Sequence, residues 1–249
     1  MESKQSSPLF RPCICLFTSL ALVGLLGGCG PGGVPSERSL NLKNAPNARD
    51  SGGYPARGGT VAWGLLYRSG KLSSITQAEC ESLRTAGIKT IIDLRNDQER
   101  VDAPDAACLF DFVRYESVPI QGAGSTRQEG YGLFISDPRF AAQFRAIFGI
   151  LAERENLPVL IHCSAGKDRV GGIVALVHLL LGVEPDDIVT DYLLSTRAGR
   201  DVKAQWLQAA LDQVQAEGGI EALLSKRGVG PETQQAVRAN LLHQSLDGQ

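Results

Sequence analysis

The chain has 249 residues, of which 43% are hydrophobic and 21% are charged, and its formal net charge is −2. This length suits one good-sized α/β domain. Positive and negative charges nearly balance, so the chain has no general excess of basic residues, and this argues against nucleic-acid binding.

The N-terminal segment has the pattern of a bacterial lipoprotein signal. Lys4 and Arg11 supply positive charge around the start of an apolar stretch, residues 13–26, which is short for a membrane span. Residues 26–29, Leu-Gly-Gly-Cys, resemble a lipobox, and acyl chains on Cys29 would hold the protein at a membrane surface. An ordinary signal peptide and an uncleaved anchor are the alternatives. We expect a lipid-anchored protein of the bacterial cell envelope, at an outer membrane facing the periplasm.

The next part of the chain predicts strands and one well-marked helix. Residues 37–59 are rich in Gly, Pro and Asn and indicate an extended entry with turns. Thr76 is a good N-cap with Glu79 three residues later, and the helix that they start ends at Gly87. Short apolar or β-rich runs predict strands at residues 60–67, 88–94 and 112–119.

The second half of the chain predicts a loop followed mainly by helices. Residues 122–136 indicate a mobile loop or a short lid. The next helix has Pro138 in its first turn, is capped by Ser136 or Asp137, and carries an apolar stripe that indicates core packing. Further helical patterns cover residues 186–195, 202–215, 220–224 and 231–242. We therefore expect an α/β fold with a central, mostly parallel sheet flanked by helices and a helical C-terminal part.

The most informative stretch is the octet at residues 162–169, His-Cys-Ser-Ala-Gly-Lys-Asp-Arg. The apolar run 157–161 before it predicts a buried strand, and residues 170–181 after it predict a helix. A tight loop between a strand and a helix suits phosphate, because its N–H groups and the helix dipole face the anion. The same field favours the thiolate form of Cys163, and the fork of Arg169 can hold two phosphate oxygens. These features imply phosphate-ester hydrolysis through a cysteinyl-phosphate.

The octet resembles the signature His-Cys-x-x-Gly-x-x-Arg of the cysteine-dependent protein tyrosine phosphatase superfamily, in the form typical of dual-specificity and phosphoinositide phosphatases. Four further segments resemble, in the same order, motifs of the bacterial tyrosine/lipid phosphatase family of secreted mycobacterial and listerial enzymes. These are residues 47–54 (N-A-R-D-S-G-G-Y), 66–70 (L-Y-R-S-G), 91–95 (I-I-D-L-R) and 191–194 (D-Y-L-L). The resemblance implies a tyrosine-phosphatase-like catalytic domain at residues 41–246, after a signal at 1–29 and a flexible tether at 30–40.

The octet and the resemblance together assign roles. We expect Cys163 to be the nucleophile, Arg169 to bind the phosphate and its transition state, and Asp168 to be the general acid. For Asp168, a salt bridge or a favourable charge at the helix N-terminus is the alternative. Rival acids are Asp93, Asp102 and Asp105. The expected substrate-binding positions are His162, Ser164, Ala165, Gly166, Lys167 and Asp93, with His162 acting mainly by orienting the loop.

For other residues in or near these motifs, the sequence leaves two alternative roles open. Lys167 adds positive charge that suits a phosphoinositide headgroup, or it is simply solvated. The trio Asn47, Arg49 and Asp50 either lines and braces the pocket or only fixes the N-terminal loop. Two other histidines, His178 and His243, are expected to be packing or surface residues.

Val170 departs from the superfamily, which usually has Ser or Thr at this position to stabilise the departing thiolate. Slow turnover or compensation by Ser164 would follow. Among the remaining cysteines, Cys163 is the odd one in an oxidising compartment and is therefore expected to be reactive. Cys80 and Cys108 either pair or remain two buried thiols.

The sequence thus predicts a phosphoric monoester hydrolase without metal or other cofactor. Its substrates would be phosphorylated proteins (phosphotyrosine or dual specificity) or phosphoinositides, and its lipid anchor would contact the membrane. The alternatives are a phosphate-binding pseudophosphatase, motivated by Val170, an inositol-phosphate phosphatase, and a rhodanese-type sulfurtransferase, which also uses a loop cysteine.

Overall fold

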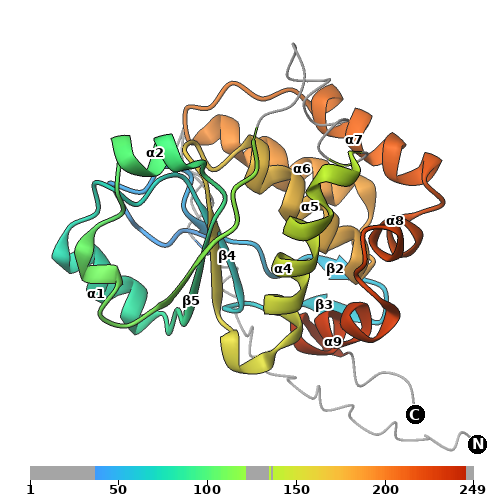
Figure 1. Ribbon diagram of the computed structural model, residues 1–249, viewed down its shortest axis with the longest axis horizontal. Coiled ribbons are helices and arrows are strands. Elements are labelled where there is room, and N and C mark those ends of the chain that lie inside the picture. Colours follow the sequence, from blue (N-terminus) through green and yellow to red (C-terminus); the bar gives the residue numbers. More distant parts are fainter. Residues whose placement is uncertain (1–36, 122–134, 136, 245–249) are drawn as a thin grey trace, which may run out of the picture.

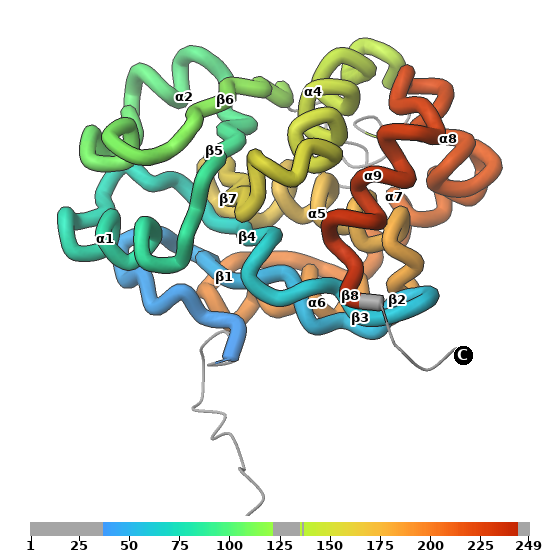
Figure 2. The backbone as a smooth tube through the Cα atoms, turned by 90° about the horizontal axis from the view of Figure 1, so that it is seen from below, coloured from blue at the N-terminus to red at the C-terminus, as the bar shows by residue number. Residues whose placement is uncertain are grey.

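The centre of the molecule is a five-stranded sheet, seen in a computed structural model that describes residues 37–121, 135 and 137–244. Helices lie on both sides of this sheet (Figure 1), and its strands lie in the order β1-β4-β7-β5-β6 (Figure 2). They are β1 (Arg49–Asp50), β4 (Leu66–Ser69), β5 (Thr90–Asp93), β6 (Arg114–Ser117) and β7 (Val159–His162). Only β1 runs antiparallel to its neighbour, so the expected mostly parallel sheet is confirmed.

Both faces of this sheet are covered, because successive side chains of its buried strands point to opposite sides. On one face, Ile91 and Leu160 pack with α1 (Gln77–Thr85) and the short helix η1 (Ala107–Leu109). On the other face, Ile92 and Ile161 belong to the larger core, which the later helices share. These are α4 (Ala141–Ala152), α5 (Asp168–Leu181), α6 (Pro185–Arg197), α7 (Ala204–Ala216), α8 (Ile220–Lys226) and α9 (Pro231–Leu241).

A small second sheet lies beside the helices and corrects one prediction. It contains β2 (Pro55–Ala56), β3 (Gly59–Val61) and β8 (Leu242–Gln244), and Figure 2 shows the C-terminal β8 next to β3. The single strand expected at residues 60–67 is therefore wrong. The chain turns between β3 and β4 at Gly64, whose φ of 75° favours glycine, and its two halves enter different sheets.

The helix signals in the sequence hold well. Thr76 caps α1 through a capping box with Glu79, and Asp137 caps a 3₁₀ turn, η2 (Pro138–Phe140), that leads into α4. The expected loop at residues 122–136 lies outside the described residues except for position 135. Within the described ranges, no helix has the length and apolar character needed to cross a membrane.

Candidate active site

The octet forms a loop at the carboxyl edge of the sheet, where ligands of such sheets bind. Strand β7 lies between β4 and β5 (Figure 2). His162 is therefore flanked in register by Ser69 and Asp93. The chain then passes through the loop into α5, and Arg169 is the second residue of that helix. Strand, loop and helix thus follow the sequence prediction.

The peptide groups of this loop are held from behind. Lys71 N donates to Ser164 O at 3.2 Å, while Asn47 Nδ2 and Arg68 Nη2 donate to Gly166 O at 2.7 and 2.8 Å. The C=O and N–H groups of a trans peptide point in opposite directions. The outward carbonyls of residues 164 and 166 therefore turn the N–H groups of residues 165 and 167 into the loop.

Cys163 lies at the inner side of this loop and is 2% exposed. Its Sγ accepts a hydrogen bond from Gly166 N at 3.3 Å. Gly166 has a φ of 68°, and a Cβ there would lie 2.5 Å from Gly70 N. Only glycine fits this close approach between the loop and the end of β4. The sulfur therefore faces the Gly166 N–H, which lies between the Ala165 and Lys167 N–H groups along the loop.

Arg169 is oriented by a residue that the sequence analysis did not identify. Glu99, on α2 (Asp97–Asp102), accepts from Arg169 Nη1 at 2.6 Å and from Nη2 at 2.7 Å. Hydrogen bonds from Arg169 and Ser164 lower the pKa of Glu99 to about 2. Burial alone would lower the pKa of Arg169, but Glu99 and the charge of Cys163 raise it. A capping box joins Asn96 and Glu99, and this Asn-x-x-Glu spacing was the signal available in the sequence.

His162 enters a buried charged network on the opposite side of the loop. Its Nε2 lies 3.2 Å from Asp105 Oδ2 and 3.6 Å from Asp93 Oδ1. Arg95 Nη2 lies 2.8 Å from both carboxylates, and Tyr115 donates to Asp93 at 2.5 Å. Burial would raise the pKa of Asp93, but hydrogen bonds from Arg95 and the charge of His162 lower it.

This network holds the two buried aspartates, Asp93 and Asp105. The ligand atoms of Asp93, Asp105 and His162 lie within 4.8 Å of one another, as in a metal site. The guanidinium of Arg95 already bridges both carboxylates, however, so the arrangement is an ion-pair network around His162. Asp93 is fully buried in it and contacts Arg95, Tyr115 and His162, while its substrate-binding role stays a prediction.

The remaining acid candidates differ in position. Asp168 begins α5 directly after the loop, and 41% of its side chain is exposed. Asp102 is exposed at the end of α2, where it accepts from Gln98. Lys167 is 8% exposed and its Nζ donates to Asp201 O at 2.8 Å. Lys167 is thus tied to the segment that follows α6 and is not a solvated lysine.

The structure also places the residues linked to the Val170 departure and the cysteines. Val170 is fully buried in the larger core. The hydroxyl of Ser164 donates its hydrogen bond to Glu99, which argues against the alternative in which Ser164 assists the sulfur. Cys80 and Cys108 form a disulfide with an S–S distance of 1.97 Å, which decides between the two readings of this pair.

A second buried network explains the other motifs. Asp191, on α6, lies 3.2 Å from Arg49 Nε and 2.7 Å from Arg68 Nη1. All three side chains are almost inaccessible to solvent. Burial would raise the pKa of Asp191, but the two arginines lower it far below its ordinary value. Asn47 and Arg68 extend this network to the loop carbonyl of Gly166, so the N-terminal motif braces the pocket.

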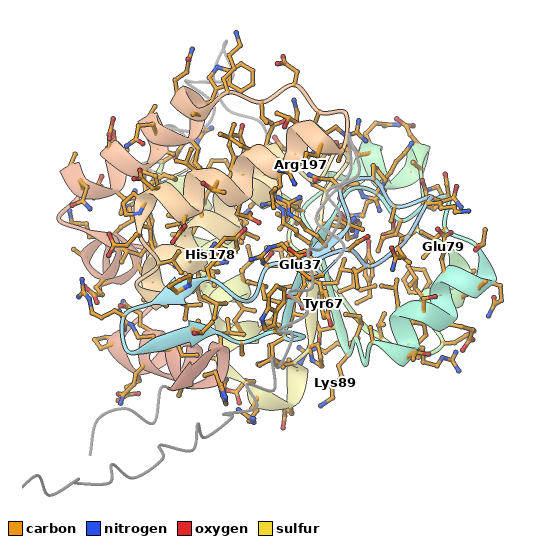
Figure 3. The ribbon with its side chains drawn as sticks, turned by 180° about the vertical axis from the view of Figure 1, so that it is seen from behind. Glu37, Tyr67, Glu79, Lys89, His178 and Arg197 are labelled. Atoms are coloured by element: carbon orange, nitrogen blue, oxygen red, sulfur yellow. A yellow bond between two sulfur atoms is a disulfide. The ribbon has the colours of Figure 1, made fainter. Side chains whose placement is uncertain are left out.

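The two other histidines lie apart from this site. His178 is buried on α5 (Figure 3), with its ring centroid 5.1 Å from that of Tyr54 and Nε2 at 2.9 Å from Ser51 O. Burial lowers its pKa. His243 is exposed on β8. Both positions agree with the packing and surface roles expected for them.

The chain is similar in sequence to tyrosine phosphatases. The model of the tyrosine phosphatase family matches residues 40–243. A protein of Cupriavidus necator is 28% identical over 209 residues, covering 77% of this chain and 74% of that protein. The triple specificity protein phosphatase PtpB of Mycobacterium tuberculosis is 31% identical, covering 57% of this chain and 64% of PtpB. A tyrosine-protein phosphatase of Nostoc commune is 30% identical, covering 52% of this chain and 48% of that protein.

Proposed function

Because the chain belongs to the tyrosine phosphatase family, we propose that it hydrolyses phosphoric monoesters through a cysteinyl-phosphate on Cys163. The observation that carries the proposal is the loop itself. The Cys163 sulfur accepts a hydrogen bond from the Gly166 N–H of the loop, and Arg169 lies in the first turn of the following helix. A thiol surrounded by fixed N–H donors and a guanidinium suits both the binding of a phosphate and an attack on its phosphorus.

The reaction proceeds in two displacements. The Cys163 thiolate attacks phosphorus, the S–P bond forms as the ester P–O bond breaks, and Asp168 gives its proton to the leaving oxygen. Water then attacks phosphorus, Asp168 takes back a proton, and the S–P bond breaks to release inorganic phosphate and the thiolate. Arg169 and the loop amides stabilise the charge on the non-bridging oxygens in both steps.

Phosphorylated protein, with phosphotyrosine first, is the substrate class that we propose. Two relatives are named as a tyrosine-protein phosphatase and a triple specificity protein phosphatase. Lys167, which favours phosphoinositides at the level of sequence, directs its ammonium to the Asp201 carbonyl at 2.8 Å. It is therefore less available to a lipid headgroup than a solvated lysine would be. Phosphoinositides and inositol phosphates are the alternative substrates, and both are included in the assay described next.

The nucleophile is tested with Cys163→Ser. This variant should lose turnover of every phosphate ester and still bind tungstate, because the loop amides and Arg169 remain. The assay uses a panel of phosphopeptides, phosphoinositides and inositol phosphates, with and without a chelator, and we expect the chelator to have no effect. Substantial residual activity of the variant would overturn the mechanism. Wild-type protein that binds tungstate without turnover would be a pseudophosphatase, and sulfur transfer from thiosulfate would indicate a rhodanese-type enzyme.

Asp168→Asn tests the general acid. Protonation of the leaving group contributes about 10²–10⁴-fold to such reactions, so kcat/KM, which reports the formation of the phosphoenzyme, should fall most for esters with a poor leaving group. The loss should be smallest for 4-nitrophenyl phosphate, whose leaving group needs little protonation. Asp102→Asn is the matched control, since Asp102 is exposed and bonded to Gln98. Equal losses for good and poor leaving groups would assign the acid elsewhere.

We also propose that Cys29 carries a lipid anchor at the bacterial cell envelope. The support is the lipobox-like sequence at residues 26–29, which lies outside the described part of the structure. Cys29→Ser should release the protein from the membrane fraction or block its processing. Unchanged membrane partition together with an unmodified N-terminus would contradict lipidation.

A further inference from the structure

Asn47 is a buried side chain that no step of the proposed reaction uses. It is 4% exposed and has a φ of 62°, in the left-handed region that asparagine tolerates better than most residues. Its Nδ2 donates to Gly166 O at 2.7 Å and to Ser195 Oγ at 3.0 Å. It thereby links the N-terminal loop, the octet and α6.

The orientation of the Asn47 amide is set by Arg49. A guanidinium can only donate hydrogen bonds, so the Asn47 oxygen must face it and the amide nitrogen must face away. Arg49 Nη1 donates to Asn47 Oδ1, and Arg49 is itself held by Asp191 through Nε at 3.2 Å. The buried ion pair therefore aims the Asn47 N–H groups at the Gly166 carbonyl.

Arg68 supplies a second donor to the same oxygen. Its Nη1 lies 2.7 Å from Asp191 Oδ2, and its Nη2 lies 2.8 Å from Gly166 O. A carbonyl oxygen accepts two hydrogen bonds through its two lone pairs. With both taken by buried donors, the plane of the peptide between Gly166 and Lys167 cannot turn without breaking them. The Lys167 N–H on the other side of that plane is thus held pointing away from Asn47 and Arg68.

We propose that Asn47 is a positioning residue, which acts through the Gly166 carbonyl to hold the Lys167 amide ready for a phosphate oxygen. This inference rests on the proposed phosphatase function. Asn47 itself is too buried, and too fully engaged, to touch a substrate. Its effect would be on the pre-organised donors that stabilise the transition state.

The sharpest test is Asn47→Asp, which keeps the size of the side chain. The oxygen facing Arg49 is retained and gains an ionic attraction, while the donor facing Gly166 becomes a carboxylate oxygen that repels the carbonyl. We expect kcat for 4-nitrophenyl phosphate to fall about tenfold or more, since loss of a fixed oxyanion donor costs up to about 10²–10³. The inhibition constant of tungstate should rise in parallel, with the thermal unfolding midpoint little changed.

Ser195→Ala is the matched control, because it removes the other acceptor of the Asn47 amide and leaves Gly166 bonded. Its kcat and tungstate affinity should stay within about twofold of the wild type. Asn47→Gly provides a second variant that accepts the same φ and deletes the donor without repulsion. It should show an intermediate loss, and it decides the matter if the aspartate variant does not fold.

The outcomes separate the two proposals. Active wild-type protein, with both Asn47 variants folded and unchanged in kcat and tungstate affinity, would overturn the role of Asn47 and leave the phosphatase function standing. Wild-type protein that neither hydrolyses phosphate esters nor binds tungstate would overturn the phosphatase function itself. A loss confined to the unfolding midpoint would show that Asn47 is only structural.

Discussion

At the scale of single residues, the guanidinium of Arg169, which we propose to bind phosphate, is paired with the carboxylate of Glu99. Glu99 takes Nη1 and Nη2 in a fork-to-fork pair at 2.6 and 2.7 Å. Such a pair fixes the plane of the guanidinium, so less rotational freedom is lost when an oxyanion binds. Ser164 also donates to Glu99 and joins the loop to the same carboxylate. We therefore propose that Glu99 acts on catalysis through Arg169 and the loop.

Glu99→Gln tests this arrangement. The amide group turns one acceptor into a donor that opposes the Arg169 donors, so the fork loses its fixed plane. We expect kcat/KM for an aryl phosphate to fall by about tenfold, the equivalent of about 1.4 kcal/mol. Asp97→Asn is the control on the same helix, because the Asp97 side chain is 89% exposed. Equal kcat/KM values for the two variants would dismiss the role of Glu99.

Val170 gives a second prediction at this scale, about the breakdown of the phosphoenzyme. The described residues place one hydrogen-bond donor at the Cys163 sulfur, the Gly166 amide, and Ser164 is turned to Glu99. Breakdown should therefore limit turnover, and rapid mixing should show a burst of phenol of about one equivalent per site. Val170→Thr should raise the steady rate by about tenfold without changing the burst rate. A wild-type reaction without a burst, and a threonine variant that behaves identically, would show that another group assists the thiolate.

At the scale of elements, local sequence patterns predicted where a helix begins but did not predict which strands pair with one another. The Thr76 and Glu79 capping box started α1 as predicted, because all its contacts lie within four residues. The strand expected at residues 60–67 failed, because the turn at Gly64 sends β3 and β4 into different sheets. That choice depends on the pairing of β3 with β8, about 180 residues away, which no local pattern encodes.

The disulfide between α1 and η1 supports a prediction about stability. Cys80 and Cys108 are separated by 28 residues, and the bond restricts that loop in the unfolded chain. The double variant Cys80→Ala and Cys108→Ala should lose about 3–4 kcal/mol of unfolding free energy in denaturant titrations. A reductant should lower the stability of the wild type toward that of the variant and leave the variant unchanged. Identical unfolding curves for oxidised wild type and variant would refute a stabilising bond.

At the scale of the whole molecule, the site is assembled by contacts between distant motifs. The sequence motifs identified the loop and the family, since these lie within eight consecutive residues or repeat a known order. The pairing of Asn47 with Gly166 spans 119 residues, and that of Arg169 with Glu99 spans 70. Nothing in a single sequence indicates which of its buried arginines meets which carboxylate, so these supports became visible only in the folded structure.

Several carboxylates of the fold have lowered pKa values, which makes stability depend on pH. Hydrogen bonds from Thr76 and Asn44 outweigh burial and hold the pKa of Glu79 at about 2, against an ordinary value of 4.5. The pKa of Glu99 is also lowered to about 2, mainly by hydrogen bonds from Arg169, and the pKa of Asp191 is lowered as well. Asp50 is the opposite case, because burial raises its pKa. A carboxylate with a lowered pKa stabilises the fold fully above its unfolded pKa and loses that contribution as pH falls.

Glu79, near the start of α1 (Figure 3), offers the clearest test of this dependence. The free energy of unfolding in urea should fall as the pH drops from about 4.5 toward 2, because the unfolded chain binds more protons there. Glu79→Gln should be less stable than the wild type at pH 7, and the two should converge as the pH approaches 2. Glu81→Gln is the control, since the Glu81 side chain is 51% exposed and should leave the pH profile unchanged. The contrary result is that the unfolding free energies of Glu79→Gln and of the wild type run parallel down to pH 2. The ionised Glu79 would then contribute no stabilisation, and the hydrogen bonds from Asn44 and Thr76 would not favour its charge.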